Sequence, residues 1–109
     1  MRIVFDQATR VPIRPYLQGH TVRTAAQQGL DRLKNGDLLT AAEEAGFDVL
    51  LTTDKNMRYQ QNLAGRKIAM IVLGQQQWPH LRPHIQRVID AVNAAAPGSI
   101  TEVEIPDTS

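Results

Sequence analysis

The sequence of 109 residues contains no cysteine, so disulfides and thiolate zinc sites are excluded. Aromatic side chains make up only 5% of it, and no window approaches the roughly 20 apolar residues that a membrane span needs. The apolar run at the start of the sequence is interrupted at Asp6, too soon for the apolar region of a signal peptide. These absences predict a cytoplasmic protein that is neither secreted nor inserted into a membrane.

The sequence also lacks an excess of charge of either sign, because the formal net charge is only +1. A charge of that size does not by itself identify a nucleic-acid-binding protein. The first third of the chain is nevertheless basic and the end is acidic. A basic rim around an acidic site would suit RNA, and an ordinary solvated surface explains the same charges equally well. The residues concerned are Arg10, Arg14, Arg23, Arg32 and Lys34 at the start and Glu102, Glu104 and Asp107 at the end.

What the sequence does contain is an alternation of short apolar runs with helical segments. Apolar or β-branched runs predict strands over residues 3–5, 20–24, 49–52 and 68–73, and an edge strand over 100–105. Helices are predicted over 11–17, 35–45, 57–63 and 78–93. The alternation indicates an α/β domain over residues 1–106, with a mostly parallel sheet of four to five strands and helices on both faces. Residues 107–109 are expected to be a frayed tail.

Local signals place the ends of the predicted helices. Asn35 is expected to cap the second helix, and Gly46 to end it. Pro15 limits the first helix, because proline lacks the N–H that continues a helix. Pro79 and Pro83 lie in or before the first turn of the last helix, where a missing N–H costs little.

Two acidic residues follow predicted strands at positions where parallel strands end. Asp6 follows the first strand and Asp54 the third, and loops at the carboxyl ends of parallel strands line a common crevice. Asp37, near the start of a helix, offers a third carboxylate. Such acids suit Mg²⁺ or Mn²⁺, which prefer oxygen ligands and can activate water on a phosphodiester. The alternative for each acid is an ordinary turn or cap residue, as for Asp48, which precedes its strand.

Three stretches carry a family resemblance: RIVFD at 2–6, GHTV at 19–22 and DVLLTTDKN at 48–56. They resemble the small PIN-like family related to VapC toxins, over residues 1 to about 73. The most specific of them is the apolar strand that ends in Thr-x-Asp-x-(Asp or Asn). The resemblance implies a PIN-like domain, a ribonuclease that holds Mg²⁺ or Mn²⁺ with three or four acids and cuts RNA by attack of water.

Matched to the family, the chain keeps some acids and replaces others. The resemblance assigns metal binding and catalysis to Asp6, Asp37 and Asp54, and it makes Asn56 a further metal ligand where the family often has a second aspartate. Amides also stand at Gln7 and Asn35, where the family tends to have acids. An amide keeps an oxygen ligand but removes a negative charge, and affinity for a divalent cation depends on that charge.

Three functional hypotheses follow. The first is a metal-dependent endoribonuclease, for which the resemblance implies the toxin of a toxin–antitoxin pair, a small antitoxin protein as partner and a homodimer. The second is a catalytically weak or inactive PIN-like module that binds RNA or a protein. The third is a receiver-like or nucleotide-binding α/β protein. The absence of a second acid beside Asp6 and of a phosphate-binding glycine loop speaks against the third.

Overall fold

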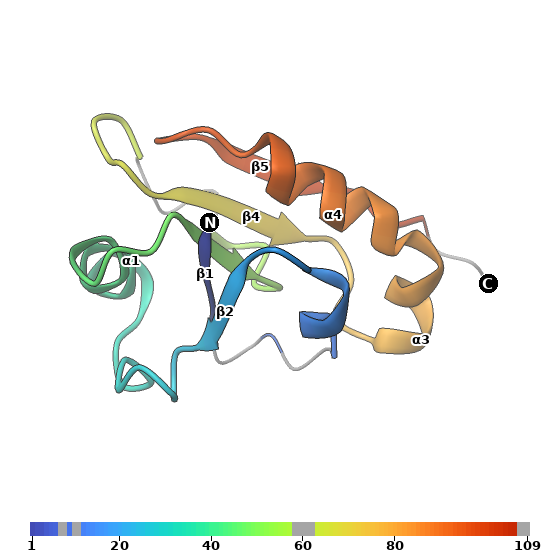
Figure 1. Ribbon diagram of the computed structural model, residues 1–109, viewed down its shortest axis with the longest axis horizontal. Coiled ribbons are helices and arrows are strands. Elements are labelled where there is room, and N and C mark those ends of the chain that lie inside the picture. The colour runs from blue at the N-terminus through green and yellow to red at the C-terminus, as the bar shows by residue number, and fades with distance from the viewer. Residues whose placement is uncertain (7–8, 10–11, 58–62, 107–109) are drawn as a thin grey trace.

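Five short strands form one parallel sheet, and helices cover both of its faces (Figure 1). The computed structural model describes residues 1–6, 9, 12–57 and 63–106. Within these residues the elements are β1 (Arg2–Phe5), η1 (Arg14–Tyr16), β2 (Thr21–Thr24), α1 (Asn35–Glu44), β3 (Val49–Thr52), β4 (Ala69–Leu73), α3 (Trp78–Leu81), η2 (Arg82–His84), α4 (Ile85–Ala94) and β5 (Ile100–Val103). The predicted fold class, a small α/β domain with a parallel sheet and helices on both faces, is confirmed.

The strands lie in the order β2-β1-β3-β4-β5, and all four pairings are parallel. β5 lies at an edge, as the sequence predicted. The chain winds from β1 outward to β2 and then returns past β1 to β3. The direction of winding therefore reverses between β1 and β3, and in open α/β sheets ligands commonly bind at the carboxyl ends of the strands beside such a reversal.

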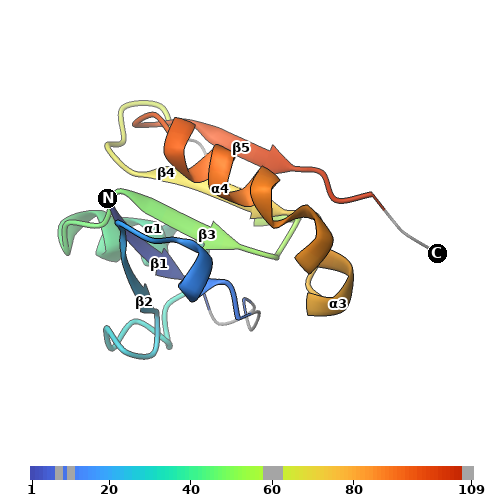
Figure 2. The ribbon, with the colours of Figure 1, turned by 45° about the vertical axis from the view of Figure 1, so that its right-hand side comes forward.

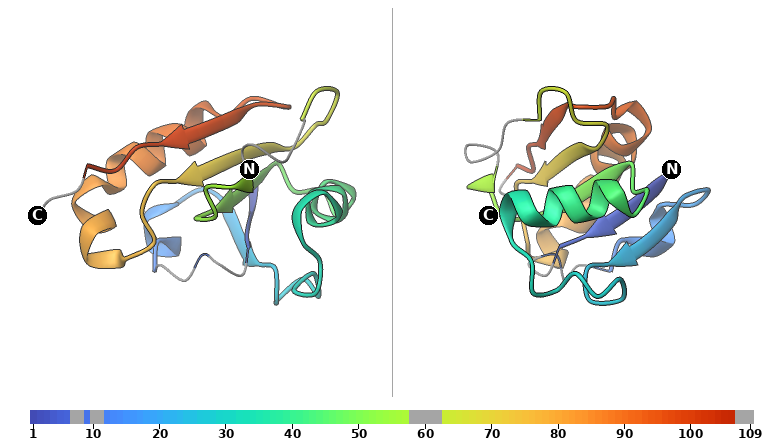
Figure 3. Two further views of the ribbon diagram at one scale, coloured as in Figure 1. Left: turned by 180° about the vertical axis from the view of Figure 1, so that it is seen from behind. Right: turned by 90° about the vertical axis from the view of Figure 1, so that its left-hand side faces the viewer.

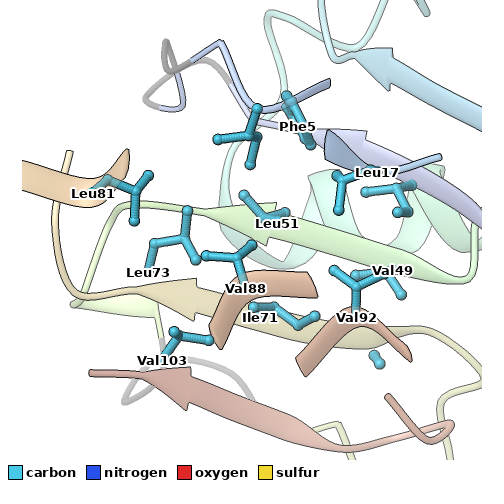
Figure 4. Packing of buried hydrophobic residues seen from close by; sticks show 13 residues of the cluster. Phe5, Leu17, Val49, Leu51, Ile71, Leu73, Leu81, Val88, Val92 and Val103 are labelled. Atoms are coloured by element: carbon cyan, nitrogen blue, oxygen red, sulfur yellow. The ribbon is translucent and has the colours of Figure 1, made fainter. Parts of the chain in front are cut away.

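Alternation along the strands divides the apolar side chains between two cores. Ile3 and Phe5 of β1 belong to one core and Val4 to the other, because successive side chains point to opposite faces of a sheet. The first core also receives Val88 and Val92 of α4, which lie over the sheet in Figure 4. Figure 2 shows α4 in front of the sheet and α1 behind it. Burial on both faces explains why β4 is apolar throughout and why β3 is apolar up to its last residue, Thr52.

Helix α1 packs against the second core and runs opposite to the strands (Figure 3, right). Gly46 ends it as predicted, with a φ of 85°. The N–H groups of Gly46 and Phe47 donate to the carbonyl oxygens of Glu43 and Ala42, the pattern that closes many helices. The predicted cap is wrong by one position, because Asn35 is the first residue of α1 and Lys34 occupies the capping position without a side-chain cap.

Two predicted helices differ from the structure at prolines. In the described part of the segment predicted over 11–17, residues 12–17, the structure has only the 3₁₀ turn η1, with Pro15 inside it. The helix predicted over 78–93 is divided into α3, η2 and α4, and Pro83 lies in the 3₁₀ turn between the two α-helices. Pro83 has no N–H to donate to the residue four positions earlier, so the α-helical pattern is interrupted there. The helix predicted over 57–63 and the tail at 107–109 fall largely or wholly outside the described residues.

Candidate functional site at the carboxyl ends of β1 and β3

The register between β1 and β3 brings Asp6 next to Thr52. The ladder pairs Val4 with Leu50 and Phe5 with Leu51, so its next step places Asp6 opposite Thr52. The N–H of Asp6 donates to the carbonyl oxygen of Leu51 at 3.2 Å, which continues the ladder past the end of β1. The first acid predicted from the sequence therefore lies at the reversal point of the sheet.

The carboxylate of Asp6 is buried and held by two hydroxyl groups. Its exposed fraction is only 8%. The hydroxyl of Thr9 donates to Oδ1 at 2.7 Å, and the hydroxyl of Thr52 donates to Oδ2. The N–H of Thr9 also donates to the carbonyl oxygen of Asp6 at 3.1 Å, so the turn after β1 is fixed at the same residue. These contacts fix the orientation of the carboxylate.

Burial raises the pKa of Asp6 above its ordinary value of 3.8, because the charged form loses solvation. The hydrogen bonds from Thr52 and Thr9 oppose this shift, and the negative charge of Asp54 reinforces it. The pKa of Asp6 is therefore raised despite two hydroxyl donors. The contribution of Asp54 also shows that the two carboxylates lie near enough to repel each other.

Thr52 connects the two acids directly. Its side-chain oxygen donates to Asp6 and accepts a hydrogen bond from the N–H of Asp54 at 3.0 Å. Thr52 is fully buried, so its hydroxyl has no competing water. One hydroxyl thus positions both the carboxylate at the end of β1 and the backbone that carries the second carboxylate.

Asp54 is half-buried and begins a tight turn. Its Oδ1 accepts a hydrogen bond from the N–H of Asn56 at 3.0 Å, an arrangement in which an aspartate side chain stabilises the turn that follows it. Within the described part of the chain, no hydrogen bond engages Oδ2 of Asp54. This oxygen is the best available ligand for a cation or a substrate hydrogen at the reversal point.

An open pocket of about 600 Å³ adjoins Asp54 between the ends of β3 and β4. Residues from both loops line it: Thr53, Asp54, Lys55, Asn56, Gly74, Gln75 and Gln76. A second pocket of about 430 Å³ shares Lys55 and Gly74 with the first and continues toward the end of β5. The predicted ligand Asn56 therefore lines the pocket, although its side chain is exposed.

Asp37 lies toward the same end of the sheet as Asp6 and Asp54, but it is not grouped with these two acids. The side chain of Arg2 donates from Nη1 to the carbonyl oxygen of Ala45 at 2.7 Å, which anchors the end of α1 at the amino end of β1. A helix of ten residues rises about 15 Å, so the first turn of α1, with Asp37, lies toward the carboxyl ends of the strands. Across residues 1–6, 9, 12–57 and 63–106, however, no three His, Cys, Asp or Glu side chains are grouped closely enough to hold a metal ion.

The structure adds residues that the sequence did not single out. Thr9 and Thr52 hold the buried carboxylate, and Gln75 and Gln76 form the wall of the pocket. The two glutamines follow β4. They could have been found by the same rule that predicted Asp6 and Asp54, namely that residues after the carboxyl ends of parallel strands lie at one edge of the sheet. The amide at Gln7 lies outside the described residues.

Comparisons of the chain with protein-family models, with curated proteins and with solved structures found no match. Among the described residues, none of the helices has both the length and the apolar character needed to cross a membrane.

Proposed function

We propose that the protein is a divalent-metal-dependent endoribonuclease of the PIN-like type, in which Asp6 and Asp54 hold Mg²⁺ or Mn²⁺. The observation that supports this most is the link between the two acids through the hydroxyl of Thr52 at the reversal point of the sheet. The resemblance of residues 2–6, 19–22 and 48–56 to PIN-like proteins points to the same chemistry. On that resemblance, the proposal extends to a cytoplasmic toxin that forms homodimers and is neutralised by a small antitoxin.

The donor set is compatible with a hard divalent cation. Mg²⁺ is often held by one or two carboxylates, with water and substrate phosphate as the remaining ligands. Asp54 offers an oxygen without a hydrogen bond from the described residues, and the hydroxyl of Thr52 joins the carboxylate of Asp6 to the backbone N–H of Asp54. A cation bound there would activate water and stabilise the charge that develops on a phosphodiester.

The chain's own residues contribute order and charge. Thr9 and Thr52 fix the carboxylate of Asp6, so little reorganisation is needed when a ligand arrives. Burial and, to a smaller extent, the negative charge of Asp54 raise the pKa of Asp6, and a cation held by the two acids would stabilise the charged form of both carboxylates. Asn56 contributes an amide at the pocket wall, where it contacts the substrate or a ligand water.

The decisive experiment is cleavage of a labelled single-stranded RNA in Mg²⁺ or Mn²⁺. Asp54→Asn is expected to lower the rate by more than about 100-fold, the upper end of what the loss of an outer-shell partner costs a metal site. Asp48→Asn is the matched control, since it makes the same chemical change at the opposite end of the sheet. The side-chain oxygen of the asparagine can still accept a hydrogen bond from the backbone N–H of Arg2. Equal cleavage by wild type and Asp54→Asn would show that the proposal is wrong.

Asp37 is tested in the same assay. It is exposed at the first turn of α1, and it does not form a ligand group with Asp6 and Asp54. We therefore expect Asp37→Asn to lower the rate less than Asp54→Asn, by weakening the electrostatic attraction for the cation. A loss as large as that of Asp54→Asn would mean that α1 moves toward the pair when the metal binds.

A second candidate is the non-catalytic module that binds RNA or a protein partner. The observation that favours it is the burial of Asp6, whose two oxygens already accept hydrogen bonds. Thermal unfolding in millimolar Mn²⁺ separates the candidates, because a ligand bound only by the folded state raises the melting temperature. A shift that disappears in Asp54→Asn supports the nuclease, whereas no shift together with retained RNA binding supports the module.

A further inference from the structure

The pocket beside Asp54 has an unusual lining for a site next to a carboxylate pair. Besides Asp54, Thr53 and Gly74, its lining consists of three neutral amides and one cation from the loops after β3 and β4: Asn56, Gln75, Gln76 and Lys55. A volume of about 600 Å³ lies within the range of small-molecule sites. Such a lining recognises hydrogen-bonding groups rather than apolar surface.

The amide of Gln75 is fixed in a known orientation. Its Oε1 accepts hydrogen bonds from the N–H groups of Gln76 and Gln77, at 3.1 and 3.0 Å. Only an oxygen can accept two N–H donors, so the amide cannot be flipped, and its NH₂ group is left to act as a donor. Lys55 carries donors and no acceptor. Apart from Asp54, which the proposed function assigns to the cation, the donors of Gln75 and Lys55 therefore favour a ligand that presents acceptors.

The neighbouring pocket does not extend this surface into a track for a phosphate chain. Its two cations, Lys55 and Arg87, are matched by two carboxylates, Glu102 and Glu104. Arg87 also donates to the carbonyl oxygen of Glu104 at 3.2 Å. Because phosphate binding depends on an excess of positive charge, a polyanion gains little there. The recognition surface is thus confined to the space next to Asp54.

We infer that this pocket binds one nucleobase, guanine or uracil, beside the phosphate that the cation at Asp54 would hold. These two bases present a carbonyl oxygen at the edge position where adenine and cytosine carry an amino group. The inference rests on the proposed function, because it is the ribonuclease activity that makes RNA the ligand. Unstacked bases in single-stranded RNA are read by hydrogen bonds to their edges, and amides and lysine are suitable partners. Gln75 and Lys55 donate to this carbonyl oxygen and to a neighbouring acceptor of the base, and Gln76 and Asn56 adapt to its remaining groups.

The test measures binding of single-stranded oligoadenylates that carry one central G, U or C, or none, by fluorescence anisotropy without added metal. We expect the G and U probes to bind wild type about tenfold more tightly than the A and C probes, equivalent to about 1.4 kcal/mol. Equal affinity for all four probes, or no binding of any of them, would overturn the inference.

Gln75→Glu is the discriminating variant. Glutamate keeps an oxygen for the N–H groups of residues 76 and 77, so the loop is retained, but the donors are lost. Gln77→Glu is the matched control, because it adds the same charge at a residue that does not line the pocket. The preference should disappear in Gln75→Glu and persist in Gln77→Glu, with unchanged melting temperatures. If Gln75→Glu keeps the preference, the assignment of that side chain is wrong.

Cleavage assays separate this inference from the proposed function. Base-selective binding by wild type without any cleavage in Mg²⁺ or Mn²⁺ would leave the pocket assignment intact and contradict the nuclease. Cleavage that depends on Asp54 but is indifferent to the neighbouring base would support the nuclease and contradict the pocket assignment.

Discussion

The two ends of the sheet use the same residue type in different ways. At the amino end, the exposed Asp48 accepts the N–H of Arg2 through Oδ2 at 2.8 Å, and its own N–H donates to the carbonyl oxygen of Arg2 at 2.8 Å. At the carboxyl end, Asp6 is buried, is held by hydroxyl groups and lies near a second acid. Asp48 joins the amino ends of β1 and β3 through hydrogen bonds, whereas Asp6 belongs to the candidate functional site.

The difference follows from topology rather than from the local sequence. At the amino end, the chain enters β1 and β3 side by side, and the short approach to β3 lets Asp48 bond the neighbouring strand. At the carboxyl end, β1 leads to β2 on one side and β3 leads to β4 on the other, because the winding reverses between these strands. Asp6 lies at this reversal and is desolvated by its neighbours instead of being solvated. Acids at the reversal point are therefore better functional candidates than acids at the other end.

The largest effect that tests this comparison is expected for Thr52→Val. Valine nearly keeps the shape of threonine but removes the hydroxyl that donates to Asp6 and accepts from Asp54. The variant leaves a buried carboxylate oxygen and a backbone N–H without their partner, and we expect unfolding to become easier by about 2–3 kcal/mol. Urea denaturation at pH 7 measures the change.

Thr52→Ser is the control, because serine restores the hydroxyl and loses only a methyl group. It should recover most of the stability and of any metal-dependent activity. If Thr52→Val is as stable as wild type, the hydroxyl does not hold the carboxylate, and the contrast between the two ends of the sheet would be lost.

A smaller effect is expected from pH, through the raised pKa of Asp6. Because burial raises this pKa in the folded protein, the folded state binds the proton more tightly than the unfolded state does. The stabilisation that comes from the raised pKa of Asp6 is fully present below pH 3.8, the ordinary pKa of an aspartate. It is lost as the pH rises through the pKa that Asp6 has in the folded protein. The loss amounts to at most about 1.4 kcal/mol per pH unit, the limit for one proton.

Urea denaturation between pH 4 and pH 7 tests this for wild type and Asp6→Asn. The stability of wild type relative to the variant should fall as the pH rises, since asparagine does not titrate. Asp48→Asn should show no such trend relative to wild type. A difference between wild type and Asp6→Asn that is constant, or that grows in favour of wild type with rising pH, would contradict the desolvation of Asp6.

The strands and the parallel character of the sheet were largely predictable from the sequence, although the strand order was not predicted. Apolar runs located β3 and β4 closely, because strands buried on both faces need apolar side chains at nearly every position. Gly46 located the end of α1, because few other residues adopt a φ of 85°. The interruption at Pro83 was missed, because a proline near a helix start is compatible with either a continuous or a broken helix.

The candidate site was only partly predictable. The positions of Asp6 and Asp54 follow from strand ends, which the sequence shows. The role of Thr52 does not, because it depends on the register that places residue 52 opposite residue 6, and register is set by packing across strands distant in sequence. The desolvation of Asp6 depends on the same packing, so its raised pKa could not be anticipated from the chain alone.

The smallest effect is expected at the amino end, for Asp48→Ala. The substitution removes one acceptor for the N–H of Arg2, but this N–H is exposed and water can replace the carboxylate. We expect a loss of about 0.5–1.5 kcal/mol of stability, measured by urea denaturation, and an unchanged response to Mn²⁺. Asp48→Asn, which keeps the acceptor, should lose less. If Asp48→Ala abolished the metal response while leaving the protein folded, the amino end would take part in the site, and the division of labour between the two ends of the sheet would be wrong.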